Sequence, residues 1–89
     1  MKRHDKYFVY IIEDKNGMYY TGYTQDVQKR LVMHEKGDGA KCLVGKKPLK
    51  LVFVKEYQYY KSALNAERKI KGYIQERKRE LVKIYENNK

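Results

Sequence analysis

The 89-residue sequence contains one cysteine, one proline and no tryptophan. The single cysteine, Cys42, excludes an intramolecular disulfide and supplies no pair of metal ligands. The longest apolar run, YFVYII at 7–12, is too short for a membrane span or the core of a signal peptide. We therefore expect a cytoplasmic protein that does not act at membranes, folded as one domain over residues 1–89.

Acidic residues are also scarce, with 11 Asp and Glu against 21 Lys and Arg, for a formal net charge of +10. Such a chain attracts polyanions at long range, and nucleic acid is the commonest polyanion in a cytoplasm. The stretch 41–55 has no acid and holds Lys41, Lys46, Lys47, Lys50 and Lys55. A surface that only favours solubility is the alternative. A membrane-surface role is disfavoured, because the basic helices lack the exposed aromatic and leucine face that it needs.

The first half of the chain predicts a β-hairpin. Residues 7–12 are apolar at both odd and even positions, which is typical of a strand at the centre of a sheet. Asn16-Gly17 is a strong hairpin signal, and MYYTGYT (18–24) reads as the returning strand.

Three helices and one more strand follow. Thr24 as N-cap and Gly37 as C-terminal stop predict a helix between them, followed by a loop over 38–48. Residues 49–57 predict a strand, with Leu49, Leu51 and Phe53 on one face. Helices are expected over 61–71 and 74–86, the second contacting the core through Leu81, Ile84 and Tyr85. This order predicts an α/β (α+β) sandwich whose three-stranded, mainly antiparallel sheet is covered by helices.

The two predicted hairpin strands place Tyr10 and Tyr20 side by side. Two tyrosines in a sheet are explained by packing and strand propensity, and this is the simpler reading of either one alone. Gly22, on the same face as Tyr20, is different, because a strand glycine commonly marks a bulge or a close approach by another backbone or a ligand.

The helix after the hairpin carries Arg30 and His34 beside its apolar stripe, in the i, i+3, i+4, i+7 series that begins at Val27. Arg30 either covers the edge of the sheet or meets a phosphate with its planar guanidinium. His34 is expected to be a hydrogen-bonded histidine rather than a metal ligand, because no second ligand stands at metal-binding spacing.

Glu67 occupies an inward position among Ala63, Ala66, Ile70, Tyr73 and Ile74. A buried carboxylate must be paired, protonated or bound to a cation. A salt bridge to one of the many basic residues is one solution, and a single Mg²⁺ ion is the other. Tyrosine hydroxyls, an arginine and one carboxylate on a basic surface together suit phosphodiester hydrolysis. Tyrosine is a poor base at neutral pH, so such a site must lower its pKa or relay the proton.

With these residues in order, the chain resembles the GIY-YIG nuclease superfamily, and specifically a small stand-alone bacterial branch, over about residues 7–75. FVY (8–10) stands where that family has Gly-Ile-Tyr, and YTG (20–22) where it has Tyr-Ile-Gly. The resemblance implies that Arg30 stabilises the phosphate and that Glu67 binds a lone divalent metal, Mg²⁺ or Mn²⁺. It also implies that His34 lies near the scissile phosphate, and that Tyr10 or Tyr20 accepts the proton.

Tyr23 departs from this resemblance, because better-studied relatives often carry a lysine there. Lys29 and Lys41 are the candidates to supply that cation, and Lys46 and Lys47 to bind the nucleic-acid backbone. The expected function is a metal-dependent endonuclease acting on DNA rather than RNA, structure-specific in repair or recombination, without a small-molecule cofactor. A monomer is assumed. The alternative is a non-catalytic, basic nucleic-acid-binding module on the same fold.

Overall fold

The computed structural model describes residues 6–39 and 41–88. Its elements follow the predicted order and are β1 (Tyr7–Glu13), β2 (Tyr19–Thr24), α1 (Val27–Lys36), a short 3-10 helix η1 (Lys41–Leu43), β3 (Lys50–Tyr57), α2 (Tyr60–Lys71) and α3 (Gln75–Asn87). The three strands form one antiparallel sheet in the order β2-β1-β3. The predicted fold class and the central position of β1 are therefore confirmed.

The hairpin between β1 and β2 is closed by Asp14 and Gly17. One carboxylate oxygen of Asp14 accepts hydrogen bonds from the backbone N–H groups of Asn16, at 2.8 Å, and Met18, at 3.0 Å. Gly17 has φ +80°, a conformation that a residue with a side chain rarely adopts. The Asn16-Gly17 signal therefore predicted the turn correctly, and the turn sets Tyr10 opposite Gly22 in the ladder.

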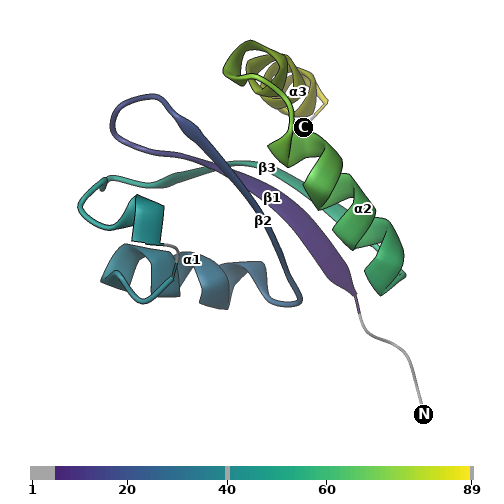
Figure 1. The fold of residues 1–89 in the computed structure, drawn as a ribbon, viewed down its shortest axis with the longest axis horizontal. Coiled ribbons are helices and arrows are strands. Elements are labelled where there is room, and N and C mark those ends of the chain that lie inside the picture. The colour runs from purple at the N-terminus through teal and green to yellow at the C-terminus, as the bar shows by residue number, and fades with distance from the viewer. Residues whose placement is uncertain (1–5, 40, 89) are drawn as a thin grey trace.

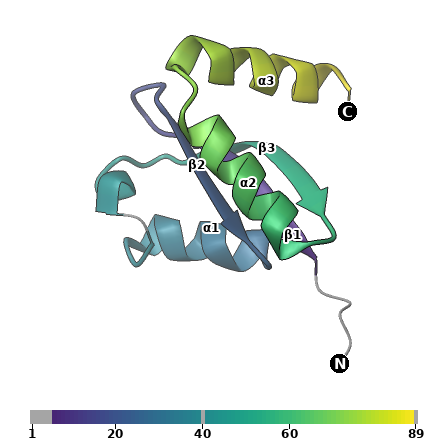
Figure 2. The same cartoon turned by 45° about the vertical axis from the view of Figure 1, so that its right-hand side comes forward.

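Helices cover both faces of the sheet. Figures 1 and 2 show α1 on one side and the α2–α3 pair on the other. The α2–α3 face holds an aliphatic core made of Val9, Ile11, Val52, Ala63, Ile70 and Val82. The α1 face holds a second cluster built on Tyr10, Ile12, Leu43 and Leu49, against which Tyr20 and Leu31 pack. Alternate residues of β1 thus supply two different cores.

The predicted face of the third strand is wrong beyond Leu51. Ile11 is paired with Phe53 and Ile12 with Leu51, so Val52 is an extra residue in a β-bulge. A bulge reverses the side on which the following residues lie. Leu49 and Leu51 pack on the α1 face, whereas Phe53 packs on the α2–α3 face and its ring lies 5.5 Å from that of Tyr85.

Helix boundaries differ from the predicted ones at a few residues. The N-cap of α1 is Asp26, not Thr24; the Asp26 carboxylate accepts from the Lys29 N–H at 3.0 Å, while Thr24 Oγ1 accepts from the Asp26 N–H at 3.1 Å. Ile74 and Ile84 were expected to face inward, but both are exposed. Ile74 is the N-cap of α3 rather than part of a helix, and Val82 and Lys78 take the buried positions of α3.

No helix among the described residues is long and apolar enough to cross a membrane.

Candidate active site

Helix α1 brings Arg30 and His34 to the sheet. Its start is fixed by the Asp26 cap, and it ends at Gly37, which has φ +86° and donates its N–H to the His34 carbonyl at 3.1 Å. Leu31 packs against the cluster on this face. Arg30 is half-buried and His34 is only 2% exposed. His34 was predicted at the edge of the apolar stripe, but it lies inside the protein.

A buried hydrogen bond joins Tyr10 of β1 to His34 of α1. The Tyr10 hydroxyl oxygen and His34 Nε2 are 2.9 Å apart, and Tyr10, like His34, is 2% exposed. The prediction of a hydrogen-bonded histidine is therefore correct. The partner is one of the two tyrosines expected at the site.

Burial keeps both members of this pair neutral. It raises the pKa of the Tyr10 phenol above its ordinary value; nearby Tyr20 and Glu67 raise it further, while Arg30 opposes the rise. Burial and the Arg30 charge together lower the pKa of His34. At neutral pH the hydrogen bond thus links a phenol to an uncharged imidazole, and Tyr10 resists becoming a phenolate.

Two glycines make room for the pair. A Cβ atom on Gly22 would lie 2.6 Å from the Tyr10 hydroxyl oxygen and 2.7 Å from its Cζ, so the phenol ring crosses the strand where Gly22 has no side chain. The side chain that approaches Gly22 is therefore that of Tyr10, on the neighbouring strand. A Cβ atom on Gly39 would overlap the His34 ring. Sequence reasoning missed Gly39, although a second glycine two residues after the helix stop was a visible signal.

Tyr20 of β2 completes the aromatic group. Its ring lies 5.5 Å from that of His34, edge to face, and 6.4 Å from that of Tyr10. Unlike Tyr10, it is only partly buried. The two tyrosines and the histidine therefore form one cluster in which Tyr20 is nearest to solvent.

Glu67 belongs to α2, on the other side of the sheet from the aromatic group. It is 7% exposed and forms a salt bridge with Lys71 Nζ at 3.0 Å. The inward position of Glu67 was predicted correctly, and the salt bridge was one of the two solutions considered. The pKa of Tyr23 is raised mainly by the hydrogen bond to Tyr60 and by burial. The charge of Glu67 adds to the rise in the pKa of Tyr10 and of Tyr23, and Arg30 opposes both rises. Arg30 and Glu67 thus lie within electrostatic reach of the same two tyrosines.

The residues around Glu67 fit a single hard cation only if water and phosphate supply most of its ligands. No group of three His, Cys, Asp or Glu side chains converges within residues 6–39 and 41–88. A lone carboxylate is nevertheless a known way to hold Mg²⁺, which usually keeps several waters and binds phosphate oxygens. The partner of Glu67 is Lys71, a residue of the same helix whose side chain is 52% exposed.

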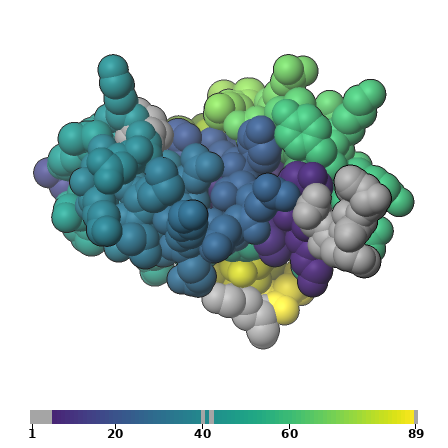
Figure 3. All heavy atoms as spheres, turned by 90° about the horizontal axis from the view of Figure 1, so that it is seen from below, coloured from purple at the N-terminus to yellow at the C-terminus, as the bar shows by residue number. Residues whose placement is uncertain are grey.

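A cavity of about 500 Å³ opens beside Arg30. It is lined by Tyr7, Tyr23, Thr24, Gln25, Arg30 and Tyr60. These residues come from β1, β2, the turn after it, α1 and α2. Figure 3 shows α1, β2 and the green start of α2 on one face of the molecule. Sequence reasoning noted Tyr23 only as a departure from a resemblance, and it did not find Tyr7 or Tyr60.

The candidate backbone-binding lysines lie in α1 and in the segment around η1. Lys29, Lys41 and Lys47 are exposed, and Lys46 is half-buried. The Lys46 carbonyl accepts a hydrogen bond from the Lys15 N–H at 3.0 Å, which ties this segment to the β1–β2 turn. Three of the four predicted cations are thus free to meet solvent and its solutes.

Comparison with known proteins identifies the family. Residues 6–80 match the model of the GIY-YIG catalytic domain. The chain belongs to the GIY-YIG family. Its relatives include a UPF0213 protein of Staphylococcus saprophyticus, 36% identical over 88% of this chain and 95% of the relative. A UPF0213 protein of Staphylococcus aureus is 39% identical over 89% of this chain and 96% of its own length.

A solved structure supports the same assignment. The solution NMR structure of a UPF0213 protein from Bacillus halodurans superposes with a TM-score of 0.59 and 37% identity, covering 89% of this chain and 84% of that one. The predicted resemblance to a small GIY-YIG branch is therefore confirmed. GIY-YIG is a family of nucleases, whereas the names of these relatives carry no activity.

Proposed function

We propose that this GIY-YIG protein is an endonuclease that hydrolyses phosphodiester bonds of DNA in the cytoplasm, using one divalent cation, Mg²⁺ or Mn²⁺. Branched, flapped or damaged DNA in repair or recombination is the proposed substrate class. One observation carries the proposal. Arg30 from α1 and Glu67 from α2, on opposite sides of the sheet, both act on Tyr10 and Tyr23. A cation and a carboxylate therefore both act electrostatically on these two phenols, in a chain of net charge +10.

Arg30 is the group we assign to the phosphate. It is half-buried and lines the cavity beside β2, so its position is restricted before a ligand arrives. A guanidinium can hold two phosphate oxygens at once and oppose the negative charge that grows on them during attack by water. The lysines at 29, 41, 46 and 47 are proposed to hold the flanking backbone.

Tyr20 is our candidate for the group that takes a proton from the attacking water. Tyr10 is less suited, because it is almost fully buried, its hydroxyl is already bonded to His34, and burial raises its pKa. We assign to Tyr10 and His34 the role of positioning residues that fix the ring of Tyr20 from one side.

Glu67 is the residue that would hold the cation. When bound there, a divalent ion supplies positive charge to the phosphate oxygens. The carboxylate itself is fixed by burial within α2, and Lys71 balances its charge in the absence of an ion.

The test is cleavage of a panel of single-stranded, flapped, branched and duplex DNA with and without Mg²⁺ or Mn²⁺. Glu67→Ala should lower the metal-dependent rate at least about a hundredfold, since the loss of a cation site removes several kcal/mol of charge stabilisation. The matched control is Glu76→Ala, which removes an exposed acid of α3 and should leave the rate unchanged. Equal residual cleavage by wild type and Glu67→Ala would reveal a contaminating nuclease.

Metal binding has a readout that does not depend on activity. Titration of Mn²⁺ should broaden the NMR resonances of residues around Glu67 in the wild type and not in Glu67→Ala. If no resonance near Glu67 changes, even with an oligonucleotide present, the cation site is absent.

The second candidate function is nucleic-acid binding without catalysis, and two features favour it. Lys71 already neutralises Glu67 at 3.0 Å, and Tyr23 supplies no cation. This function predicts salt-sensitive DNA binding that Arg30→Ala barely changes, with no product in any metal.

A further inference from the structure

Three tyrosines form a cluster at the mouth of the Arg30 cavity. The Tyr60 ring lies 5.8 Å from that of Tyr7 and 5.9 Å from that of Tyr23, edge to face in both cases. Tyr60 is 46% exposed, so much of its ring is open to solvent. The three residues come from β1, β2 and the first turn of α2. We call Tyr7, Tyr23 and Tyr60 the tyrosine cluster.

Two hydroxyl groups of the tyrosine cluster contact each other. The Tyr23 hydroxyl lies 3.5 Å from that of Tyr60, and this contact is the main cause that raises the pKa of Tyr23; burial adds to it. The aromatic rings offer faces on which a flat ring of a ligand can stack. Arg30 lines the same cavity and adds a positive charge, while Thr24 and Gln25 add groups that can donate and accept hydrogen bonds.

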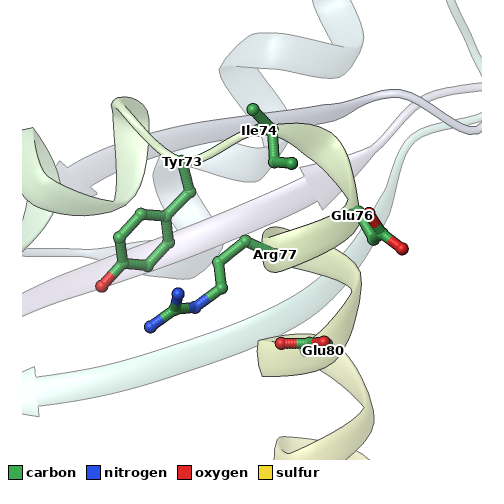
Figure 4. A pocket seen from close by; sticks show the side chains of 5 residues that line it. All are labelled: Tyr73, Ile74, Glu76, Arg77 and Glu80. Atoms are coloured by element: carbon green, nitrogen blue, oxygen red, sulfur yellow. The ribbon is translucent and has the colours of Figure 1, made fainter.

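A second cavity, of about 280 Å³, is also lined by an arginine and a tyrosine, but its other lining residues differ from those of the Arg30 cavity. At the start of α3 the Arg77 guanidinium lies 4.9 Å from the centre of the Tyr73 ring, and Glu76 and Glu80 line the same cavity (Figure 4). There the arginine already stacks on the tyrosine, and two carboxylates repel anions. Among residues 6–39 and 41–88, no acid lines the Arg30 cavity. Of the two, only the Arg30 cavity suits an anionic ligand.

We propose that the tyrosine cluster and Arg30 form a subsite for an unpaired nucleotide, with the base stacked on Tyr60 and its phosphate on Arg30. The combination of aromatic rings and cations is typical of proteins that bind single-stranded nucleic acid, because every base has a face that can stack. The volume of about 500 Å³ is within the range of small-molecule sites. A base inside a duplex offers no free face, so the subsite selects single strands, flaps or extruded bases.

This inference rests on the proposed function, because it specifies the substrate of the same site. It assigns a role to the residue that departs from the family pattern. Where Tyr23 stands, a lysine would add charge but no aromatic surface. Tyr23 instead contributes an aromatic ring to the lining of the base-binding subsite.

The experiment measures binding without catalysis. Fluorescence anisotropy in EDTA is used with two probes, a short oligothymidylate strand and a blunt duplex of the same length. Tyr60→Ala should weaken binding of the single strand about tenfold, as expected for one lost stacking contact, and binding of the duplex less than about twofold. Tyr60→Phe keeps the ring and should bind as the wild type does, whereas Tyr60→Leu should behave as Tyr60→Ala.

Tyr59→Ala is the matched control. Tyr59 precedes Tyr60 in the chain, is 69% exposed, makes no side-chain cap bond and does not line the cavity. Its removal should change neither affinity. The subsite is wrong if Tyr60→Ala binds both probes as the wild type does, weakens both equally, or matches Tyr59→Ala. It is also wrong if the wild type binds no single strand at low salt.

Failure of the subsite and failure of the nuclease are distinguishable. Metal-dependent cleavage that is lost in Glu67→Ala and unchanged in Tyr60→Ala would retain the nuclease and remove the subsite. Selective loss of single-strand binding in Tyr60→Ala, with no cleavage in any metal, would retain the subsite on a binding module.

Discussion

The two faces of the sheet are built on alternate residues of one strand, yet they are constructed differently. Towards α2 and α3, Val9 and Ile11 enter an aliphatic core and are fully buried. Towards α1, Tyr10 enters a cluster that contains a buried polar pair and is accommodated by two glycines. Hydrophobic burial is non-directional, whereas a hydrogen-bonded pair demands one geometry. The first face therefore mainly stabilises the fold, and the second mainly fixes the positions of chemical groups.

The largest expected effect tests whether stability resides mainly on the α2–α3 face. Ile11→Ala should lower the free energy of unfolding by about 2–5 kcal/mol, because it removes buried apolar volume and leaves a cavity. Tyr10→Phe, one residue away on the other face, should lower it by about 1–3 kcal/mol through the loss of the bond to His34. Urea unfolding of both variants measures the difference. If Tyr10→Phe proves the more damaging, the assignment of roles to the two faces is reversed.

A smaller effect tests the geometry of the α1 face. In Gly22→Ala the new Cβ would meet the Tyr10 hydroxyl at 2.6 Å, so the ring must move away from His34. We expect a loss of about 1–3 kcal/mol of stability. The nearest atom to a Cβ on Gly72 is 3.5 Å away, so Gly72→Ala is the control and should change stability by less than about 0.5 kcal/mol. Equal stability of both variants would show that Tyr10 has free space to move.

The smallest expected effect concerns pH. Burial and Arg30 lower the pKa of His34 below 6.5, so the unfolded chain binds a proton more readily than the folded one. The stability associated with neutral His34 is fully present above pH 6.5 and is lost as the pH falls through 6.5 towards the lower folded-state pKa. Thermal unfolding midpoints should therefore fall less steeply with acid in His34→Gln than in the wild type. Parallel pH profiles of the two proteins would contradict a neutral His34.

Much of the fold followed from local sequence signals. The two-sided apolar strand at 7–12 predicted the centre of the sheet, and Asn16-Gly17 predicted the turn that pairs Tyr10 with Gly22. The bulge at Val52 could not be predicted in the same way, because alternation continues through it in the sequence and only pairing with β1 shows the extra residue. Ile74 continued a helical apolar pattern but became exposed at the start of α3.

The sequence predicted which residues belong to the candidate site, but it did not predict which of them contact one another. Tyr10, Tyr20, Arg30, His34 and Glu67 could each be named because polar residues at inward or strand positions are unusual. The hydrogen bond between Tyr10 and His34, which are 24 residues apart in the chain, depends on how closely α1 packs against β1. The convergence of Tyr7, Tyr23 and Tyr60 also requires three elements to meet.

The sequence by itself determined the order of elements, the excess of positive charge and the inward glutamate, because these depend on composition and on local periodicity. Only the tertiary structure decided which phenol is buried, which is open to solvent and which charges act on it. Burial and electrostatic interaction depend on the distances between elements, and those distances exist only once the helices have packed on both faces of the sheet.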